Sequence, residues 1–252
     1  IVGAVDTTSL RTSETKIAVG NLAGQTTQGN NAVAVGSAAG YTGQGGSAVA
    51  VGYTAGLTTQ GANAIAVGYS AGNTTQGVEA VAIGRLAGTT AQGNNAVAVG
   101  PYAGQTTQGG SAVAVGRLAG DTSQGANAIA VGVYAGKTTQ SGYAVAIGNS
   151  AGETTQGASA VAIGNDAGKT TQGISAVAIG DTAGKTNQGE DSIAIGKEAG
   201  ETNQAANSII LNATGAALNN IVEDVFIVKP VRSAVGTTML MYDVTSGEVT
   251  HT

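Results

Sequence analysis

Small apolar residues, glycines and polar residues follow one another along this chain in a pattern that repeats every 16 residues. Glycine recurs at this spacing from Gly20 to Gly196 without an insertion, which gives twelve units in register. The units follow the consensus N/S-A-V/I-A-V/I-G-x-x-A-G-x-T-T-Q-G-x. A strict period of this length stacks equivalent residues above one another. The pattern predicts an all-β fold, a parallel β-solenoid or β-roll of twelve 16-residue coils, roughly 58 Å long at a strand spacing of ~4.8 Å.

Within one unit, residues 32–35 (A-V-A-V) predict a short strand, because β-branched residues at period two favour a pleated surface. Glycines bracket the bend that follows, where positive φ is accessible to them at little cost. Residues 42–44 predict a return strand, and the Gln row predicts a ladder of stacked side-chain amides. We interpret the repeated positions as structural ladders: Thr26, Gln28, Val33, Val35, Gly36, Ala39, Gly40 and their equivalents.

The predicted strands are apolar on both faces. Val33 and Val35 point one way while Ala32 and Ala34 point the other, so one face can fill the coil interior and the other needs a cover. A strip twelve coils tall would expose roughly 600 Å², at the upper limit for a soluble monomer. Its burial would contribute on the order of 15 kcal/mol per chain before association costs. We therefore predict a homo-oligomer with these strands near its symmetry axis.

Composition limits the chemistry. Among 252 residues there are 42 glycines, one histidine and no cysteine, and aromatic residues make up 3% of the chain. The sequence predicts no catalytic site, no cofactor and no metal site, since convergent titratable groups and ligand spacings are missing. A net charge of −5 argues against nucleic-acid binding, and the apolar runs are too short for membrane insertion.

The regularity ends near residue 211, which divides the chain into three parts. Residues 1–16 are a lead-in segment, residues 17–211 are the solenoid, and residues 212–252 form a short C-terminal β segment that caps the solenoid or continues as a stalk. Ile209, Ile210 and Leu211 replace V-A-V with larger side chains, as suits a terminal coil. Residues 238–252 predict a hairpin that turns at Ser246-Gly247.

The repeated N-A-V-A-V-G and S-A-V-A-I-G segments resemble the head repeats of trimeric autotransporter adhesins (YadA-like heads). That resemblance covers residues 17 to about 211 and departs from the family in the 16-residue period and the T-T-Q-G segment. It implies a left-handed parallel β-roll, a homotrimer and an adhesive role at a bacterial cell surface.

The A-G-x-T-T-Q-G repeat, together with residues 226–230 (F-I-V-K-P), is also similar to viral and phage tail-fibre proteins. In those proteins such a segment precedes a self-cleaving chaperone domain. This second resemblance implies a virion-surface fibre with a cleavage site near Thr252.

Two functions follow from these observations. The first is an extracellular structural and adhesive fibre, whose partners are further copies of the chain and a surface glycan or protein receptor. Tyrosines at variable outward positions could then stack on sugars: Tyr41, Tyr53, Tyr69, Tyr102 and Tyr134. The alternative is an ice-binding solenoid with a stacked Thr face. Adjacent threonines should point to opposite faces, which predicts that only one Thr row is outward.

Overall fold

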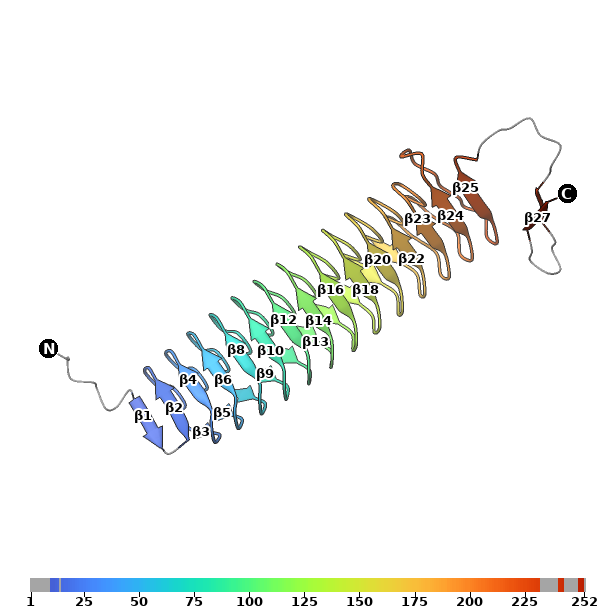
Figure 1. Ribbon diagram of the computed structural model, residues 1–252. Helices are drawn as coiled ribbons and strands as arrows, with labels where there is room; N and C mark the ends of the chain where they lie inside the picture. Colours follow the sequence, from blue (N-terminus) through green and yellow to red (C-terminus); the bar gives the residue numbers. More distant parts are fainter. Residues whose placement is uncertain (1–9, 14, 232–239, 243–248, 252) are drawn as a thin grey trace.

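The protein is a rod of stacked coils that runs from residue 10 at one end to residue 231 at the other (Figure 1). The computed structural model describes residues 10–13, 15–231, 240–242 and 249–251. All regular elements in these residues are β-strands, so the predicted all-β solenoid is confirmed. No helix occurs there that is long and apolar enough to cross a membrane.

The larger sheet runs the length of the rod and contains fifteen strands. Each comes from the V-A-V segment of a coil or its equivalent at either end. In spatial order these strands are β1 (Leu10–Ser13), β2 (Lys16–Val19), β4 (Val33–Val35), β6 (Val49–Val51), β8 (Ile65–Val67), β10 (Val81–Ile83), β12 (Val97–Val99), β14 (Val113–Val115), β16 (Ile129–Val131), β18 (Val145–Ile147), β20 (Val161–Ile163), β22 (Val177–Ile179), β23 (Ile193–Ile195), β24 (Ile209–Asn212) and β25 (Phe226–Lys229).

The smaller sheet has ten strands of two residues each, which come from the T-T-Q segment. They are β3 (Thr27–Gln28), β5 (Gly43–Gln44), β7 (Thr59–Gln60), β9 (Thr75–Gln76), β11 (Ala91–Gln92), β13 (Thr107–Gln108), β15 (Ser123–Gln124), β17 (Thr139–Gln140), β19 (Thr155–Gln156) and β21 (Thr171–Gln172). Isolated parallel bridges, Gln172 with Gln188 and Thr186 with Thr202, continue this edge of the rod.

The register is that of a strict repeat. In both sheets, each residue pairs in parallel with its equivalent 16 positions later, as Val97 does with Val113. At the N-terminal end β1 is instead antiparallel to β2. At the other end the ladder continues past residue 211, because β25 pairs in parallel with β24. Strands β26 (Leu240–Tyr242) and β27 (Val249–His251) form the predicted antiparallel hairpin, whose turn lies outside the described residues.

The interior is built from alanine. We call equivalent positions 16 residues apart a row and name it by one member. The Ala34 row on the larger sheet faces the Ala39 row, and both are almost completely buried from the first coil to the last. Among the residues whose burial the structure describes, the only larger apolar one fully buried with them is Ile210. Val33 and Val35 therefore lie outside, which decides the choice of face that the sequence left open.

Both corners of each coil close with a β-turn that places a residue at positive φ. Gly36 accepts a backbone bond from Ala39 at 3.3 Å, and Gly45 accepts one from Ala48 at 3.3 Å. The third residue of each turn, Ala38 in one and Ser47 in the other, has a φ of +55° and +57°. The sequence pattern assigned positive φ to the bracketing glycines, Gly36 and Gly40, which have it, but missed these two non-glycine positions. Backbone hydrogen bonds that both residues donate to the preceding coil, Ala38 to Asn21 and Ser47 to Asn30, offset their strain.

Candidate binding surfaces

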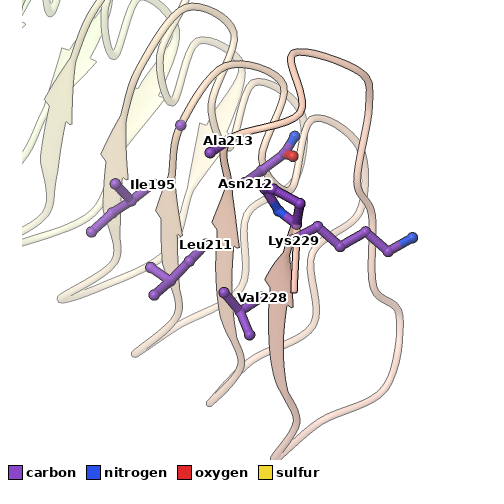
Figure 2. Close-up of a pocket in the computed structure, with 8 residues that line it drawn as sticks. Ile195, Leu211, Asn212, Ala213, Val228 and Lys229 are labelled. Atoms are coloured by element: carbon purple, nitrogen blue, oxygen red, sulfur yellow. The ribbon is translucent and has the colours of Figure 1, made fainter. Parts of the chain in front are cut away.

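The outward face of the larger sheet carries a continuous apolar strip. It consists of the Val33 and Val35 rows, which run from Ile17 and Val19 to Ile209 and Leu211, and it continues on β25 with their pairing partners Phe226 and Val228. Most of these side chains are half-buried by their neighbours above and below, and several isoleucines remain 36–40% exposed. Figure 2 shows Ile195, Leu211 and Val228 projecting in the same direction from β23, β24 and β25. No charged residue interrupts these two rows from Ile17 to Val228.

The Gln28 row points into the coil, opposite to the strip. From Gln44 onward each of these amides is nearly or fully buried. Gln108 Nε2 donates to the carbonyl of Val97 at 2.8 Å and to that of Ala112 at 3.3 Å. The Gly40 row makes room for the amides, since a Cβ on Gly104 would come within 2.8 Å of Gln108 Oε1. The glutamine side chain thus closes the corner between the smaller and the larger sheet, where Val97 and Ala112 are themselves joined by a backbone hydrogen bond.

The amides also bond along the rod. Gln92 Nε2 donates to Gln108 Oε1 at 3.1 Å, and the same bond recurs coil by coil as far as Gln204. Between Gln28 and Gln92 the described residues include no such bond, and the Oε1 atoms of Gln44, Gln60, Gln76 and Gln92 have no partner. The predicted amide ladder therefore spans the later coils only, and nothing in the structure explains its absence in the earlier ones.

The threonines of the smaller sheet lie outside. The prediction that only one row faces outward was wrong, because Thr58 and Thr59 are both exposed, as are their equivalents in most coils. The smaller-sheet strands contain only the second Thr and the Gln, so the first Thr lies in the bend before the strand and the alternation rule does not reach it. The result is a polar face with two adjacent threonine rows.

The tyrosines occupy two kinds of site on the corners. Tyr53 and Tyr69 are 54% and 51% exposed, and their rings stack at a centroid distance of 5.4 Å. Tyr102 and Tyr134 are half-buried at positive-φ turn positions and lie against cationic side chains. Tyr41 is half-buried beside the Thr face, in the row that also holds Asp121 and its equivalents. Tyr41 was expected at an outward position, but its row is partly covered along most of the rod.

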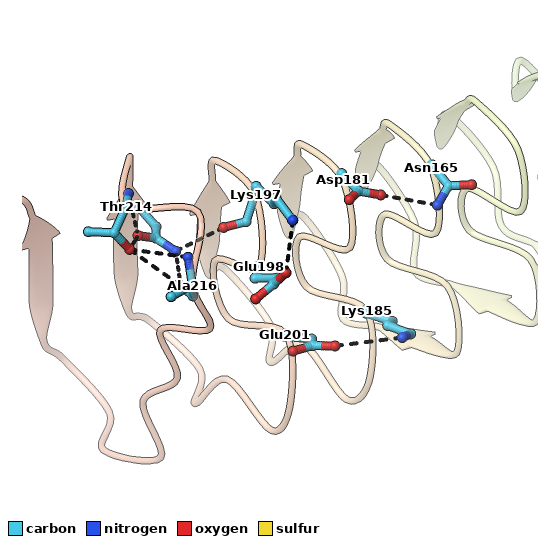
Figure 3. A network of polar contacts seen from close by, with 9 residues as sticks. Asn165, Asp181, Lys185, Lys197, Glu198, Glu201, Thr214 and Ala216 are labelled. Carbon is cyan, nitrogen blue, oxygen red and sulfur yellow. Dashed lines mark hydrogen bonds and ion pairs between the residues drawn. The ribbon is translucent and has the colours of Figure 1, made fainter.

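Charged pairs gather at the C-terminal half of the rod, as Figure 3 shows. Lys185 lies 3.6 Å from Glu201, and Lys197 lies 3.3 Å from Glu198. Lys169 contacts two carboxylates, and its hydrogen bond with Asp166 raises the pKa of the ammonium group. Asp121 differs, because partial burial raises the pKa of its carboxyl group despite the nearby Lys137, and its Oδ1 is buried without a hydrogen-bond partner.

Within the described residues, no three His, Asp or Glu side chains come close enough together to hold a metal ion. The features that the coils repeat are surfaces: the apolar strip, the twin Thr rows and the corners that carry tyrosine and charge.

Comparison with protein-family models and with curated proteins gives no match to this sequence.

Proposed function

We propose that this chain is a structural and adhesive component of an extracellular fibre, on a virion or a bacterial cell surface, and that it assembles with copies of itself. The observation that carries the proposal is the outward strip, mainly Val and Ile, along the larger sheet from β2 to β25. Water contact with so long an apolar surface is costly, and a second copy presents the same strip in the same register. The resemblance to trimeric adhesin heads and viral fibres favours a trimer.

A rod of identical coils is suited to such a role. Each coil contacts only its neighbours, so length is set by the number of repeats, while the corners can vary without disturbing the interior. The rows of Ala, Gly and Gln hold the shape, and the variable corner residues are free to contact a receptor. No step in this function requires a catalytic group.

The test is the native mass in solution, measured by light scattering behind a sizing column. A mass near three times 24.1 kDa is the expected result. A larger, open filament would support self-assembly through the strip but contradict the closed trimer. A stable monomer would contradict the oligomer altogether.

A second function, ice binding, is favoured by one observation: both threonine rows are exposed side by side along the smaller sheet. The neighbouring row weighs against it, because from Asp121 onward that row carries Lys137, Glu153, Lys169 and Lys185 beside the threonines. Thermal hysteresis of ice growth separates the two functions. Hysteresis that disappears on Thr58→Lys and Thr74→Lys would establish ice binding, and its absence at high protein concentration would exclude it.

A further inference from the structure

The corner that follows the larger sheet carries a line of aromatic and cationic side chains over six successive coils. We call it the cationic-aromatic edge and define it by Tyr53, Tyr69, Arg85, Tyr102, Arg117, Tyr134 and Lys137. From the fifth coil to the eighth, Arg and Tyr alternate coil by coil. Because each coil advances ~4.8 Å, the two arginines lie roughly 10 Å apart along the rod.

The contacts within this edge link neighbouring coils. The Arg85 guanidinium lies 4.9 Å from the ring centre of Tyr102, and it also donates to the Tyr102 hydroxyl. Arg117 lies 4.4 Å from the ring centre of Tyr134, where Lys137 is also within 5.0 Å. Stacking of this kind holds a guanidinium in place while most of its five N–H donors stay available.

The arginines have no carboxylate partner. Within the described part of the chain, no carboxylate oxygen lies within 4.0 Å of Arg85 or Arg117, whereas Lys169, Lys185 and Lys197 farther along the rod are all paired. Residues 41–137 carry three cationic and two acidic side chains, a net charge of +1. Residues 138–231 carry four lysines and nine acidic side chains, a net charge of −5. The cationic-aromatic edge therefore lies in a stretch of the rod with a net positive charge, whereas the stretch that follows is acidic.

We infer that the cationic-aromatic edge binds a linear anionic polysaccharide, with carboxylate or sulfate groups on the arginines and sugar faces on the tyrosines. Arginine's planar fork matches both anions, and the two exposed stacked rings extend the surface with flat apolar area. Too few cations are present to track a nucleic-acid backbone. The inference rests on the proposed adhesive function and names the receptor chemistry.

The test is binding of the intact protein to immobilised dextran sulfate and to polygalacturonate, with unmodified dextran as the neutral comparison. We expect both anionic polymers to bind and dextran not to bind. The double variant Arg85→Gln/Arg117→Gln should weaken binding at least about tenfold. A matched control, Lys185→Gln/Lys197→Gln, removes the same charge from the carboxylate-paired end and should change affinity less than about twofold.

Three outcomes would overturn the inference. The first is an equal loss of affinity for the anionic polymers in both double variants, which indicates unspecific attraction. The others are an unchanged affinity in the arginine variant and binding of unmodified dextran as tight as that of the anionic polymers. Tyr53→Ala/Tyr69→Ala should weaken binding to both anionic polymers as well, and unchanged affinity would contradict the role of the tyrosines. Light scattering of each variant keeps the two proposals apart, since the arginine variant should keep the native mass whether or not it binds polysaccharide.

Discussion

The two sheets run along the same rod and stack in the same register, yet they use their inward and outward positions in opposite ways. The larger sheet places alanine inside and Val or Ile outside, while the smaller sheet places a glutamine amide inside and threonine outside. The inside of the rod is thus partly polar and one outside face is apolar. Where the fold leaves no volume inside, large apolar residues are driven to the surface, and in the proposed assembly a second copy of the chain covers them.

The contrast between the two outward faces predicts that substitutions have their largest effect on assembly, when they fall on the apolar strip. Val113→Lys with Val145→Lys puts two charges on the apolar strip and should convert the oligomer to a monomer, because unpaired charges inside an interface lose their hydration. Thr107→Lys with Thr139→Lys puts the same charges on the Thr face and should leave the mass unchanged. Light scattering measures both. If the Thr variant lost assembly, or if the Val variant kept it, the interface would not lie on the apolar strip of the larger sheet.

The corners that join the sheets provide the next test. Gly100 ends a strand of the larger sheet at a φ of +125°, and a Cβ there would lie 2.7 Å from the Gly116 carbonyl oxygen. Gly100→Ala should cost about 2–4 kcal/mol of unfolding free energy. Gly110, in the corner after the smaller sheet, has ordinary φ and 3.5 Å of clearance from the Asn94 carbonyl, so Gly110→Ala should be neutral or stabilise by up to about 1 kcal/mol.

Denaturant unfolding followed by circular dichroism measures this pair. A similar loss of unfolding free energy in both variants would mean that the two corners are alike. Close approach of the backbone of the next coil would then not be the reason for glycine at Gly100. A stable Gly100→Ala would mean that neighbouring coils can separate locally at little cost.

The polar interior of the smaller sheet should contribute less per residue. Gln108→Leu keeps a side chain of similar size but leaves the carbonyls of Val97 and Ala112 without their amide partner, at a cost of about 1–3 kcal/mol. Gln28→Leu is the matched control at the end of the row, where the amide is only half-buried. Its effect on the unfolding midpoint should be smaller, because the Gln28 amide is less buried and lies outside the amide ladder, and an equal effect would contradict the prediction.

The smallest effect is expected beside the smaller sheet, at Asp121. Burial favours the protonated carboxyl and raises its pKa above the ordinary value of 3.8. The folded state therefore binds this proton more tightly than the unfolded state, so the contribution to stability falls as pH rises through the raised pKa. Asp121→Asn should stabilise the protein slightly at neutral pH and lose that advantage below pH 3.8. Thermal unfolding midpoints of both proteins measured over a pH series check this. If the Asn variant gained stability relative to the unsubstituted protein as the pH fell, the predicted direction of the pKa shift would be contradicted.

Several features could be predicted from the sequence because they depend only on spacing. The glycine period sets the number and register of the strict coils. The frequent Asn or Ser at the positive-φ position before each strand, as in Asn31 and Ser47, is a turn signal that the sequence pattern missed. The hairpin at the C-terminal end followed from alternation and a turn motif. Candidate surfaces were harder to predict, since exposure depends on how the coil closes.

By itself the sequence determined the solenoid: a strict period, small residues in two rows and glycine at each bend leave few other structures. Only the tertiary structure decided which face is inside, because alternation defines two faces without ranking them. The narrow coil, already filled by Gln108 and its equivalents against the Gly104 row, has volume for Ala98 but none for Val97. The bend before each short strand likewise turned both Thr rows outward, a local departure from alternation that no spacing rule contains.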